Sequence, residues 1–321
     1  MDRTIFDRWS TALASWSMDG SSVFEVRLAP HASDVDFALR LVEPKDLHGH
    51  PRATPPSHAR FMAQGWPQLG FPEPISALWL EFDQRRVFDT HNMDPVGAAP
   101  EDPVMCFKLS GNPTARWIAE ELWPRSTGRV MPPAQRRCVA RCLDALPPED
   151  GGAAPKLLYV FDLSARGSDA IRLELFGLSA TAAGKYLERV AGRRAAAQLD
   201  EWTQRLGDCD RPHLSFDVYD EVGPRIGWEL GFSRLPEHEP GWARLADRLV
   251  ALGLADPEKR EALFRWPGVD TVRSSPRHWP EGGLGHCVRC LSHFKVVTWP
   301  DRPAEAKAYL LFENVLKPKG A

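Results

Sequence analysis

Residues 159–180, YVFDLSARGSDAIRLELFGLSA, carry the repeating pattern from which the fold is predicted. Two segments in which apolar and polar residues alternate, YVFDLS and AIRLELFG, flank the short sequence ARGSD. Alternation with a period of two is typical of a β-strand with one buried face, and a connection rich in Gly, Ser and Asp is typical of a tight turn. The stretch therefore predicts an antiparallel hairpin.

The same pattern occurs four more times when the chain is aligned on a phenylalanine followed by a charged residue. The first strands are SVFEVRL around Phe24, LWLEFDQ around Phe82, HLSFDVY around Phe216 and SHFKVVTW around Phe294. Their second strands are DFALRLVE, VMCFKLSG, PRIGWELGF and EAKAYLLF. With the hairpin around Phe161, the chain predicts five hairpins and ten antiparallel strands.

Segments with helical spacing separate the hairpins. They cover residues 114–123, 133–146, 180–190, 195–206, 241–253 and 257–264, with further helices expected at 3–16 and 56–65. Asp256 followed by Pro257 is typical of a helix start, and Gly253 is typical of a helix end. The long segment between Asp83 and Pro103 predicts surface decoration or a lid.

Ten antiparallel strands with their helices on one face predict a closed barrel, because closure removes the unpaired edges of a sheet. The expected fold class is α+β, with five repeats of two strands and two helices and the helices in an outer ring. Only the sequence PPEDGGAAP near residue 150 could separate two halves. We therefore expect residues 1–321 to form a single domain.

The alternation assigns side chains to the two faces of the barrel. It turns the aligned phenylalanines toward the helices and gives every hairpin at least one basic residue inside. The inner set of the second strands is Arg40, Lys108, Arg172, Glu174, Arg225, Glu229, Lys307 and Tyr309. The inner set of the first strands is Glu25, Asp83, Asp162, Asp217 and Lys295, together with Trp79, Glu81, His213, Ser215, His293 and Trp299.

Two interpretations of this charged inner face remain open. Basic side chains inside a barrel of this width supply charge-assisted donors for an anion such as a diphosphate. Alternatively, each inner acid neutralises a nearby base, for example Asp162 with Arg172 and Asp217 with Arg225. The fifth hairpin carries Lys295 where the others carry an acid, so the cations there are expected to lack partners of their own.

Composition excludes several classes of function. Lys and Arg total 40, Asp and Glu total 43, and the net charge of -3 comes without a basic block, which argues against a nucleic-acid partner. No apolar stretch approaches the length of a membrane span, and the charged N-terminus differs from a signal peptide. These features predict a cytoplasmic protein without a membrane partner, whose 6 cysteines are reduced thiols.

This arrangement resembles the ABBA-type aromatic and peptide prenyltransferases, whose barrels have ten antiparallel strands in five repeats. The strand AKAYLLF, with Lys307 and Tyr309, looks like the strands that hold the prenyl diphosphate in that family, and residues 159–180 are similar to a hairpin of its bacterial members. The resemblance implies a diverged member. It implies diphosphate contacts at Lys108, Arg172, Arg225, Lys295, Lys307 and Tyr309, and an aromatic pocket at Trp79, Phe176 and Trp299.

The implied reaction moves an allylic isoprenoid from dimethylallyl or geranyl diphosphate to an aromatic small molecule or a peptide side chain. Glu81, Glu174 and Glu229 are the candidate bases, and each is also a candidate ion-pair partner of an arginine. No cofactor is required and Mg²⁺ is optional. We expect no metal site, because the ligand-type residues of HCVRCLSH point to opposite faces of a strand. The alternative function is a non-catalytic barrel that binds a peptide or a small hydrophobic ligand in a biosynthetic pathway.

Overall fold

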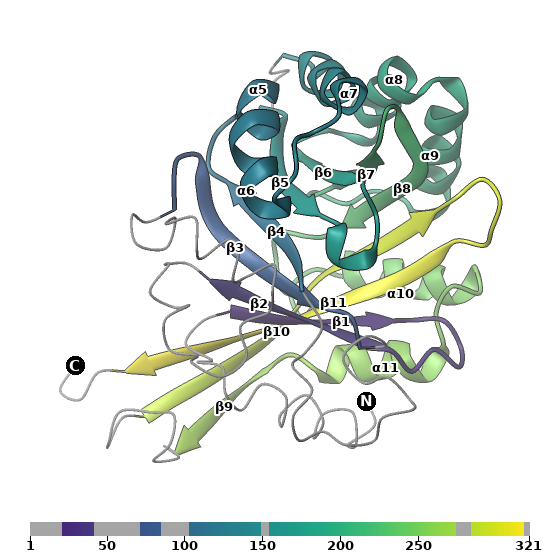
Figure 1. The fold of residues 1–321 in the computed structure, drawn as a ribbon. Coiled ribbons are helices and arrows are strands. Elements are labelled where there is room, and N and C mark those ends of the chain that lie inside the picture. The colour runs from purple at the N-terminus through teal and green to yellow at the C-terminus, as the bar shows by residue number, and fades with distance from the viewer. Residues whose placement is uncertain (1–20, 42–70, 85–102, 149–153, 274–283, 318–321) are drawn as a thin grey trace, which may run out of the picture.

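A computed structural model describes residues 21–41, 71–84, 103–148, 154–273 and 284–317 (Figure 1). All described strands belong to one antiparallel sheet. The strands are β1 (Ser21–Arg27), β2 (Val35–Leu41), β3 (Ile75–Phe82), β4 (Val104–Leu109), β5 (Lys156–Asp162), β6 (Ile171–Phe176), β7 (His213–Val218), β8 (Val222–Leu230), β9 (Gly268–Arg273), β10 (Leu284–Thr298) and β11 (Glu305–Lys317).

The sheet closes into a barrel, as the hairpin pattern predicts. Strands β1 to β8 follow one another in chain order, β8 pairs with β10, and β10 and β11 pair with each other before β11 returns to β1. Ten strands therefore form a ring without an edge. The additional strand β9 pairs with the first half of β10, where that strand extends beyond the barrel.

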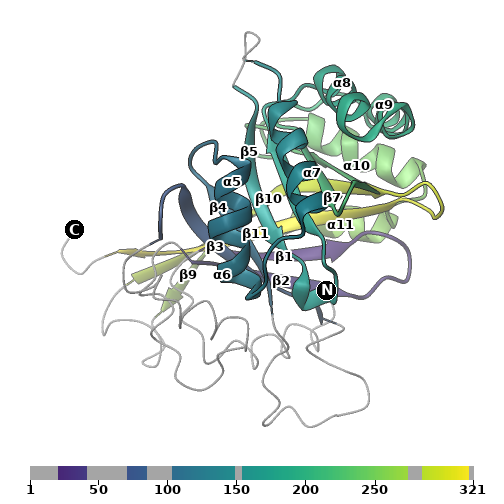
Figure 2. The ribbon, with the colours of Figure 1, turned by 45° about the horizontal axis from the view of Figure 1, so that its top comes forward.

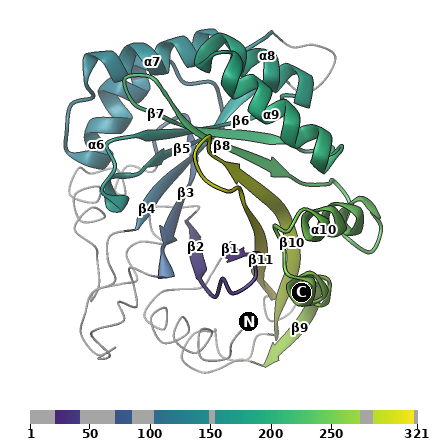
Figure 3. The same cartoon turned by 90° about the vertical axis from the view of Figure 1, so that its right-hand side faces the viewer.

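Helices cover the outside of this ring. They are α5 (Ala115–Trp117), the π-helical turn η2 (Ile118–Leu122), α6 (Trp123–Thr127), α7 (Pro133–Asp144), α8 (Ala180–Ala191), α9 (Arg193–Leu206), α10 (Gly241–Ala251) and α11 (Pro257–Arg265). In Figure 3, α7, α8 and α9 lie over β5 to β8, and α10 lies beside β10. Figure 2 shows α8 and α9 side by side, with α10 next to them.

Local capping explains where several helices begin. The Ser179 hydroxyl accepts a hydrogen bond from the amide of Ala182 at the start of α8. The Asp256 carboxylate accepts from the amides of Glu258 and Lys259 at the start of α11, as its sequence predicts. The helices expected at 3–16 and 56–65 and most of the expected lid lie outside the described residues. None of the described helices combines the length and apolarity that crossing a membrane requires.

The main hydrophobic core lies between the barrel and the helices. Phe24 stacks on Phe312, and Phe37 packs at a tilt against both, at the outer face of β1, β2 and β11. Trp242 of α10 packs against Phe294 of β10, and both side chains are fully buried. Each such side chain contributes about 1.5 to 3 kcal/mol by leaving water, so the outer face accounts for much of the stability of the closed ring.

The third hairpin departs from the predicted faces. Phe161 pairs with Cys106 and Arg172, which face inward, and Asp162 pairs with the outward-facing Ile171. The expectation that Asp162 lies inside and forms an ion pair with Arg172 is therefore wrong. A register shift between Leu157 and Tyr159 changes the alternation in β5, and an irregularity of this kind cannot be read from a period of two.

Candidate active site

The inner face of the barrel carries charged side chains from nearly every strand, in rows set by the strand register. One row contains Lys108, Tyr159, Glu174, Ser215 and Gly227 on β4 to β8. Neighbours within a row are cross-strand partners, with Cα atoms about 4.5 to 5.5 Å apart. The register thus determines which inner groups can interact.

Glu25 on β1 holds the two predicted diphosphate ligands of β11. The Lys307 ammonium and the Tyr309 hydroxyl both donate hydrogen bonds to its carboxylate. Burial alone would raise the pKa of Glu25, but the Lys307 charge and the two hydrogen bonds lower it well below its usual range. The expectation that the cations of the fifth hairpin lack partners is therefore wrong for Lys307, because the acid comes from the neighbouring strand β1.

Lys295 on β10 also has a partner on an adjacent strand. Its ammonium donates to Glu229 Oε1 at 2.5 Å and lies 4.0 Å from Glu174 Oε2. The other oxygen of Glu229 faces two imidazoles, 3.5 Å from His213 Nδ1 and 3.4 Å from His293 Nε2. His213 Nδ1 is in turn 3.0 Å from Glu174 Oε1. These five buried or half-buried groups form one connected cluster.

The cluster shifts the pKa values of its two glutamates in opposite directions. Burial, followed by the charge of Glu229, raises the pKa of Glu174. Burial would raise the pKa of Glu229 as well, but the Lys295 ammonium and the two imidazoles lower it below its usual range. Of the two, Glu174 is the better proton acceptor, because a base with a raised pKa holds a proton more firmly.

Arg172 and Arg225 share one acid near the opposite end of the barrel. Arg172 donates to both oxygens of Asp217, at 2.6 and 3.3 Å. Arg225 Nη1 is buried, lies 3.7 Å from Asp217 Oδ1 and has no hydrogen-bond partner among the described residues. Burial and the charge of Arg172 lower the pKa of Arg225 to about 10. Two of the predicted diphosphate ligands thus compete for one carboxylate.

The third predicted base, Glu81, contacts an arginine that is not among the predicted site residues. Arg166 belongs to a short 3₁₀ turn (η3, Ser164–Arg166) between β5 and β6. It donates to both oxygens of Asp83, at 2.6 and 2.8 Å, and reaches Glu81 Oε2 at 3.4 Å. Burial raises the pKa of Glu81. The turn residue Arg166 therefore binds two acids at the end of β3.

A second group of cations has no acidic partner among the described residues. We call it the basic quartet, and its members are Arg40, Lys108, Lys156 and Arg211. Burial, and then the charges of Arg40, Lys156 and Arg211 in that order, lower the pKa of Lys108. Three neighbouring cations disfavour the charge of Lys108, and no described carboxylate forms an ion pair with the quartet, so this end of the barrel is suited to an anion.

Two buried donors, one in the quartet and one on the neighbouring strand, have no acceptor among the described residues. Arg40 on β2 and Trp79 on β3 are cross-strand partners. Arg40 Nε and Trp79 Nε1 are both buried and have no hydrogen-bond partner within the described part of the chain. A buried donor without an acceptor costs about 1 to 3 kcal/mol. Two such donors on paired residues, near the other three cations of the quartet, indicate a site for an oxygen-rich anion.

An apolar wall lines the inner face beyond these donors. Its buried members are Val104, Cys106, Phe161, Leu163 and Ala170, with Trp79, Tyr159 and Ala165 packed against them. Tyr159 lies between Lys108 and Glu174 in the strand register. The wall thus places aromatic surface between the basic quartet and the better of the two clustered bases.

The remaining pocket residues occupy different places. Phe176 ends β6, packs edge-to-face on His213 and has the Lys156 ammonium 5.9 Å from its ring. Trp299 follows β10 in the connection to β11, where the Arg302 guanidinium stacks 3.6 Å above its ring. The structure therefore places Phe176 beside the cluster and Trp299 apart from it.

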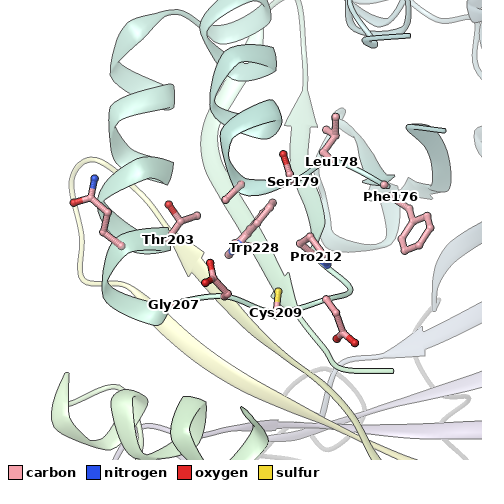
Figure 4. Close-up of a pocket in the computed structure, with 13 residues that line it drawn as sticks. Phe176, Leu178, Ser179, Thr203, Gly207, Cys209, Pro212 and Trp228 are labelled. Carbon is pink, nitrogen blue, oxygen red and sulfur yellow. The ribbon is translucent and has the colours of Figure 1, made fainter. Parts of the chain in front are cut away.

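Phe176 also borders a groove on the outer side of the barrel rim (Figure 4). The groove has a volume of about 570 Å³ and lies between the start of α8 and the end of α9. Trp228 of β8, whose side chain belongs to the outer core, lies on its inner wall, and Ser179 and Cys209 face it from two sides.

The predicted diphosphate residues thus form three groups instead of one. Lys108 lies with the basic quartet, Lys295, Lys307 and Tyr309 are held by Glu229 and Glu25, and Arg172 and Arg225 lie with Asp217. Sequence reasoning placed Arg40 on the inner face but did not include it in the site. The signal that identifies it, an orphan donor beside Trp79, exists only in three dimensions.

The fold is an α+β barrel of ten antiparallel strands ringed by helices, as the resemblance implied. No family model and no curated protein matches the chain. Among solved structures, the crystal structure of PriB in a binary complex with product diphosphate is similar, with 17% identity, 91% of this chain and 79% of that chain covered, and a TM-score of 0.44. The apo form of the prenyltransferase PriB aligns with 16% identity over the same shares of the two chains, and its TM-score is also 0.44. Likeness at this level says nothing about the residues of the site.

Proposed function

We propose that the chain is a prenyltransferase that binds an allylic diphosphate at the basic quartet and transfers the isoprenoid to an aromatic or peptide acceptor inside the barrel. The observation that carries the proposal is the pair of orphan donors, Arg40 Nε and Trp79 Nε1, beside an unneutralised Lys108. A diphosphate supplies the negative charge and the acceptor oxygens that the described residues around Arg40 and Lys108 do not provide.

Each step of the transfer has a candidate group. The quartet stabilises the leaving diphosphate as its bond to the allylic carbon breaks. The aromatic faces of Trp79, Tyr159 and Phe161 shield the resulting cation. The acceptor's carbon or heteroatom forms the new bond, and its proton passes to the cluster of Glu174, His213 and Glu229. Neither Arg172 nor Lys307 is needed, because an internal acid already holds each of them.

The rival function is a barrel that binds a ligand without catalysis. The ion pairs of Lys295 and Lys307 favour it, because these cations are neutralised by the fold itself. Both functions place a ligand in the barrel, but only transfer requires an activated diphosphate. Binding of a diphosphate is therefore the first measurement, and release of pyrophosphate in the presence of an indole or phenol acceptor is the second.

The test is thermal unfolding with dimethylallyl diphosphate, geranyl diphosphate or inorganic pyrophosphate. A ligand that binds only the folded state raises the melting temperature. We expect the rise in the wild-type chain and its loss in Lys108→Ala and in Arg40→Ala. Lys185→Ala, on the exposed face of α8, serves as a matched control and keeps the rise. A rise that persists in both quartet variants, or no rise in the wild-type chain, would overturn the proposed site.

A further inference from the structure

Three strands bring three ligand-type side chains together in the barrel. Glu174 comes from β6, His213 from β7 and Glu229 from β8, and each offers one ligand atom within 4.8 Å of the other two. The strand register causes this, because His213 is the cross-strand partner of Glu229, and Glu174 is paired with Ser215, two residues further along β7. Both carboxylates are buried.

Two of the three separations among these atoms match those of ligands around one ion, and the third is no more than 4.8 Å. His213 Nδ1 is 3.0 Å from Glu174 Oε1 and 3.5 Å from Glu229 Oε2. Nitrogen and oxygen ligands bound to zinc at about 2.0 to 2.2 Å are about 3.0 to 3.5 Å apart from one another. An ion could therefore replace the present hydrogen bond with little movement of the backbone.

Lys295 contacts the second oxygen of each carboxylate, and the oxygens nearest His213 are the other two. Its ammonium binds Glu229 Oε1, while Glu229 Oε2 faces His213. It also lies near Glu174 Oε2, on the side away from the Oε1 atom that contacts His213. The ammonium balances part of the charge of two carboxylates and holds both in place, which is the role of outer-shell partners at metal sites.

Two further groups surround the three ligands. His293 Nε2 lies 3.4 Å from Glu229 Oε2. The Ser215 hydroxyl is fully buried and has no hydrogen-bond partner among the described residues. A Cβ at Gly227 would come within 2.3 Å of Ser215 Oγ and 3.0 Å of Lys295 Cε, so the glycine makes room for both. An orphan hydroxyl beside the three ligands is a ready partner for a water molecule on a bound ion.

We propose that Glu174, His213 and Glu229 form a site for one divalent transition-metal ion, with Zn²⁺ as the preferred ion. One imidazole with two carboxylates suits Zn²⁺ better than Mg²⁺ or Ca²⁺, which prefer oxygen ligands alone. Three protein ligands leave a position open for water or for an oxygen of a bound molecule. The three ligands are also the groups that accept the acceptor's proton in the proposed prenyl transfer, so a bound ion would occupy that base, whereas binding of the ion does not require that transfer occurs.

No pattern along the chain indicates this site. The three ligands are 39 and 16 residues apart in sequence, as 213 − 174 and 229 − 213 show. The sequence HCVRCLSH has ligand-type residues at closer spacing, yet of these only its last residue, His293, contacts a residue of the cluster. Ligands from three separate strands become neighbours only when the barrel closes.

The test uses the full chain, stripped of metal by a chelator, dialysed, and titrated with ZnCl₂, CoCl₂ or MgCl₂ in a calorimeter. We expect one Zn²⁺ per chain and weaker binding of Mg²⁺. Loss of a ligand should weaken Zn²⁺ binding at least about tenfold in His213→Ala and in the nearly isosteric Glu174→Gln. His286→Ala and Cys287→Ser are matched controls outside the cluster and should bind Zn²⁺ like the wild-type chain. Circular dichroism verifies the fold of each variant.

The absorption spectrum of the Co²⁺ form separates this site from binding by cysteine. Imidazole and carboxylate ligands give weak visible bands, whereas thiolates add strong near-ultraviolet charge transfer. Absence of bound Zn²⁺, binding that is unchanged in Glu174→Gln, or a thiolate band would each overturn the proposed site. Because no diphosphate is present, these outcomes are independent of whether the barrel transfers a prenyl group. If His213→Ala fails to fold, Zn²⁺ binding by Glu174→Gln and the Co²⁺ spectrum still test the proposed site.

Discussion

The two groups of cations inside the barrel differ in one respect, which is whether the fold supplies an acid. Lys295 and Lys307 each contact a glutamate on an adjacent strand. Lys108 and Arg40 have no such acid among the described residues, and repulsion from its neighbours contributes to the lowered pKa of Lys108. A buried cation with an internal partner stabilises the closed barrel, whereas one without a partner favours an anion from solution. Buried lysines thus stabilise the barrel where a glutamate contacts them, and we propose that they bind an anion in the basic quartet.

The largest effect is expected from breaking an internal pair. Glu25→Gln removes the charge that holds Lys307 and accepts from Tyr309. Removing one partner of a buried pair leaves an uncompensated charge and costs about 3 to 5 kcal/mol. The free energy of unfolding, measured with urea, should fall by that amount.

Two companion variants check the cause of that loss. Glu188→Gln breaks a pair with Arg193 whose side chains are both more than half exposed, and it should change the free energy of unfolding by less than about 1 kcal/mol. The double variant Glu25→Leu with Lys307→Met replaces the buried charges by apolar groups and should recover much of the loss. An equal cost for Glu25→Gln and Glu188→Gln would show that the internal pair does not stabilise the barrel.

Much of the barrel can be predicted from the sequence, because the alternation records which face of each strand meets the helices. It places Arg172, Lys295 and Lys307 on the inner face, where the structure has them. The predicted closure places β1 beside β11 but does not give the register between the two strands, so the partner of Lys307 is missed. The identity of Glu25 as that partner depends on ring closure, which brings together residues 282 positions apart.

The site is less predictable than the fold for the same physical reason. Whether a cation is free depends on every acid within reach, and those acids come from other strands. The register shift in β5 also changes which residues face inward, so Phe161 joins the inner wall and Asp162 leaves it. An irregularity of one residue cannot be predicted from the alternation of apolar and polar residues, yet it changes which side chains line the site.

The second expected effect concerns the pH dependence of the basic quartet. The folded chain lowers the pKa of Lys108 through burial and neighbouring cations. Between that lowered value and the ordinary lysine value, the unfolded chain binds more protons than the folded chain, so stability rises with pH. Pyrophosphate binding should change in the opposite direction, because the neutral amine no longer attracts the anion. Loss of one charge-assisted hydrogen bond corresponds to about tenfold weaker binding.

Titration of pyrophosphate from about pH 7.5 to about pH 10, near the ordinary lysine pKa, measures this change. Lys108→Arg is the matched control, because a guanidinium stays protonated across the range. It should bind pyrophosphate with a much flatter pH dependence than the wild-type chain. Parallel pH profiles for the two chains would mean that Lys108 does not contact the anion.

The smallest expected effect tests the orphan donor on its own. Trp79→Phe keeps an aromatic ring in the inner wall but removes Nε1, which is buried and has no partner among the described residues. Pyrophosphate should bind more weakly by about 1 kcal/mol, the value of one hydrogen bond, which is about fivefold. The free energy of unfolding should change little, because removing an unsatisfied donor offsets part of the lost packing. Trp228→Phe, in the outer core, is the matched control. It should lower the free energy of unfolding and leave the affinity for pyrophosphate unchanged. If Trp79→Phe binds pyrophosphate as tightly as the wild-type chain, the indole does not donate to the anion, and the site is limited to the cations around Lys108.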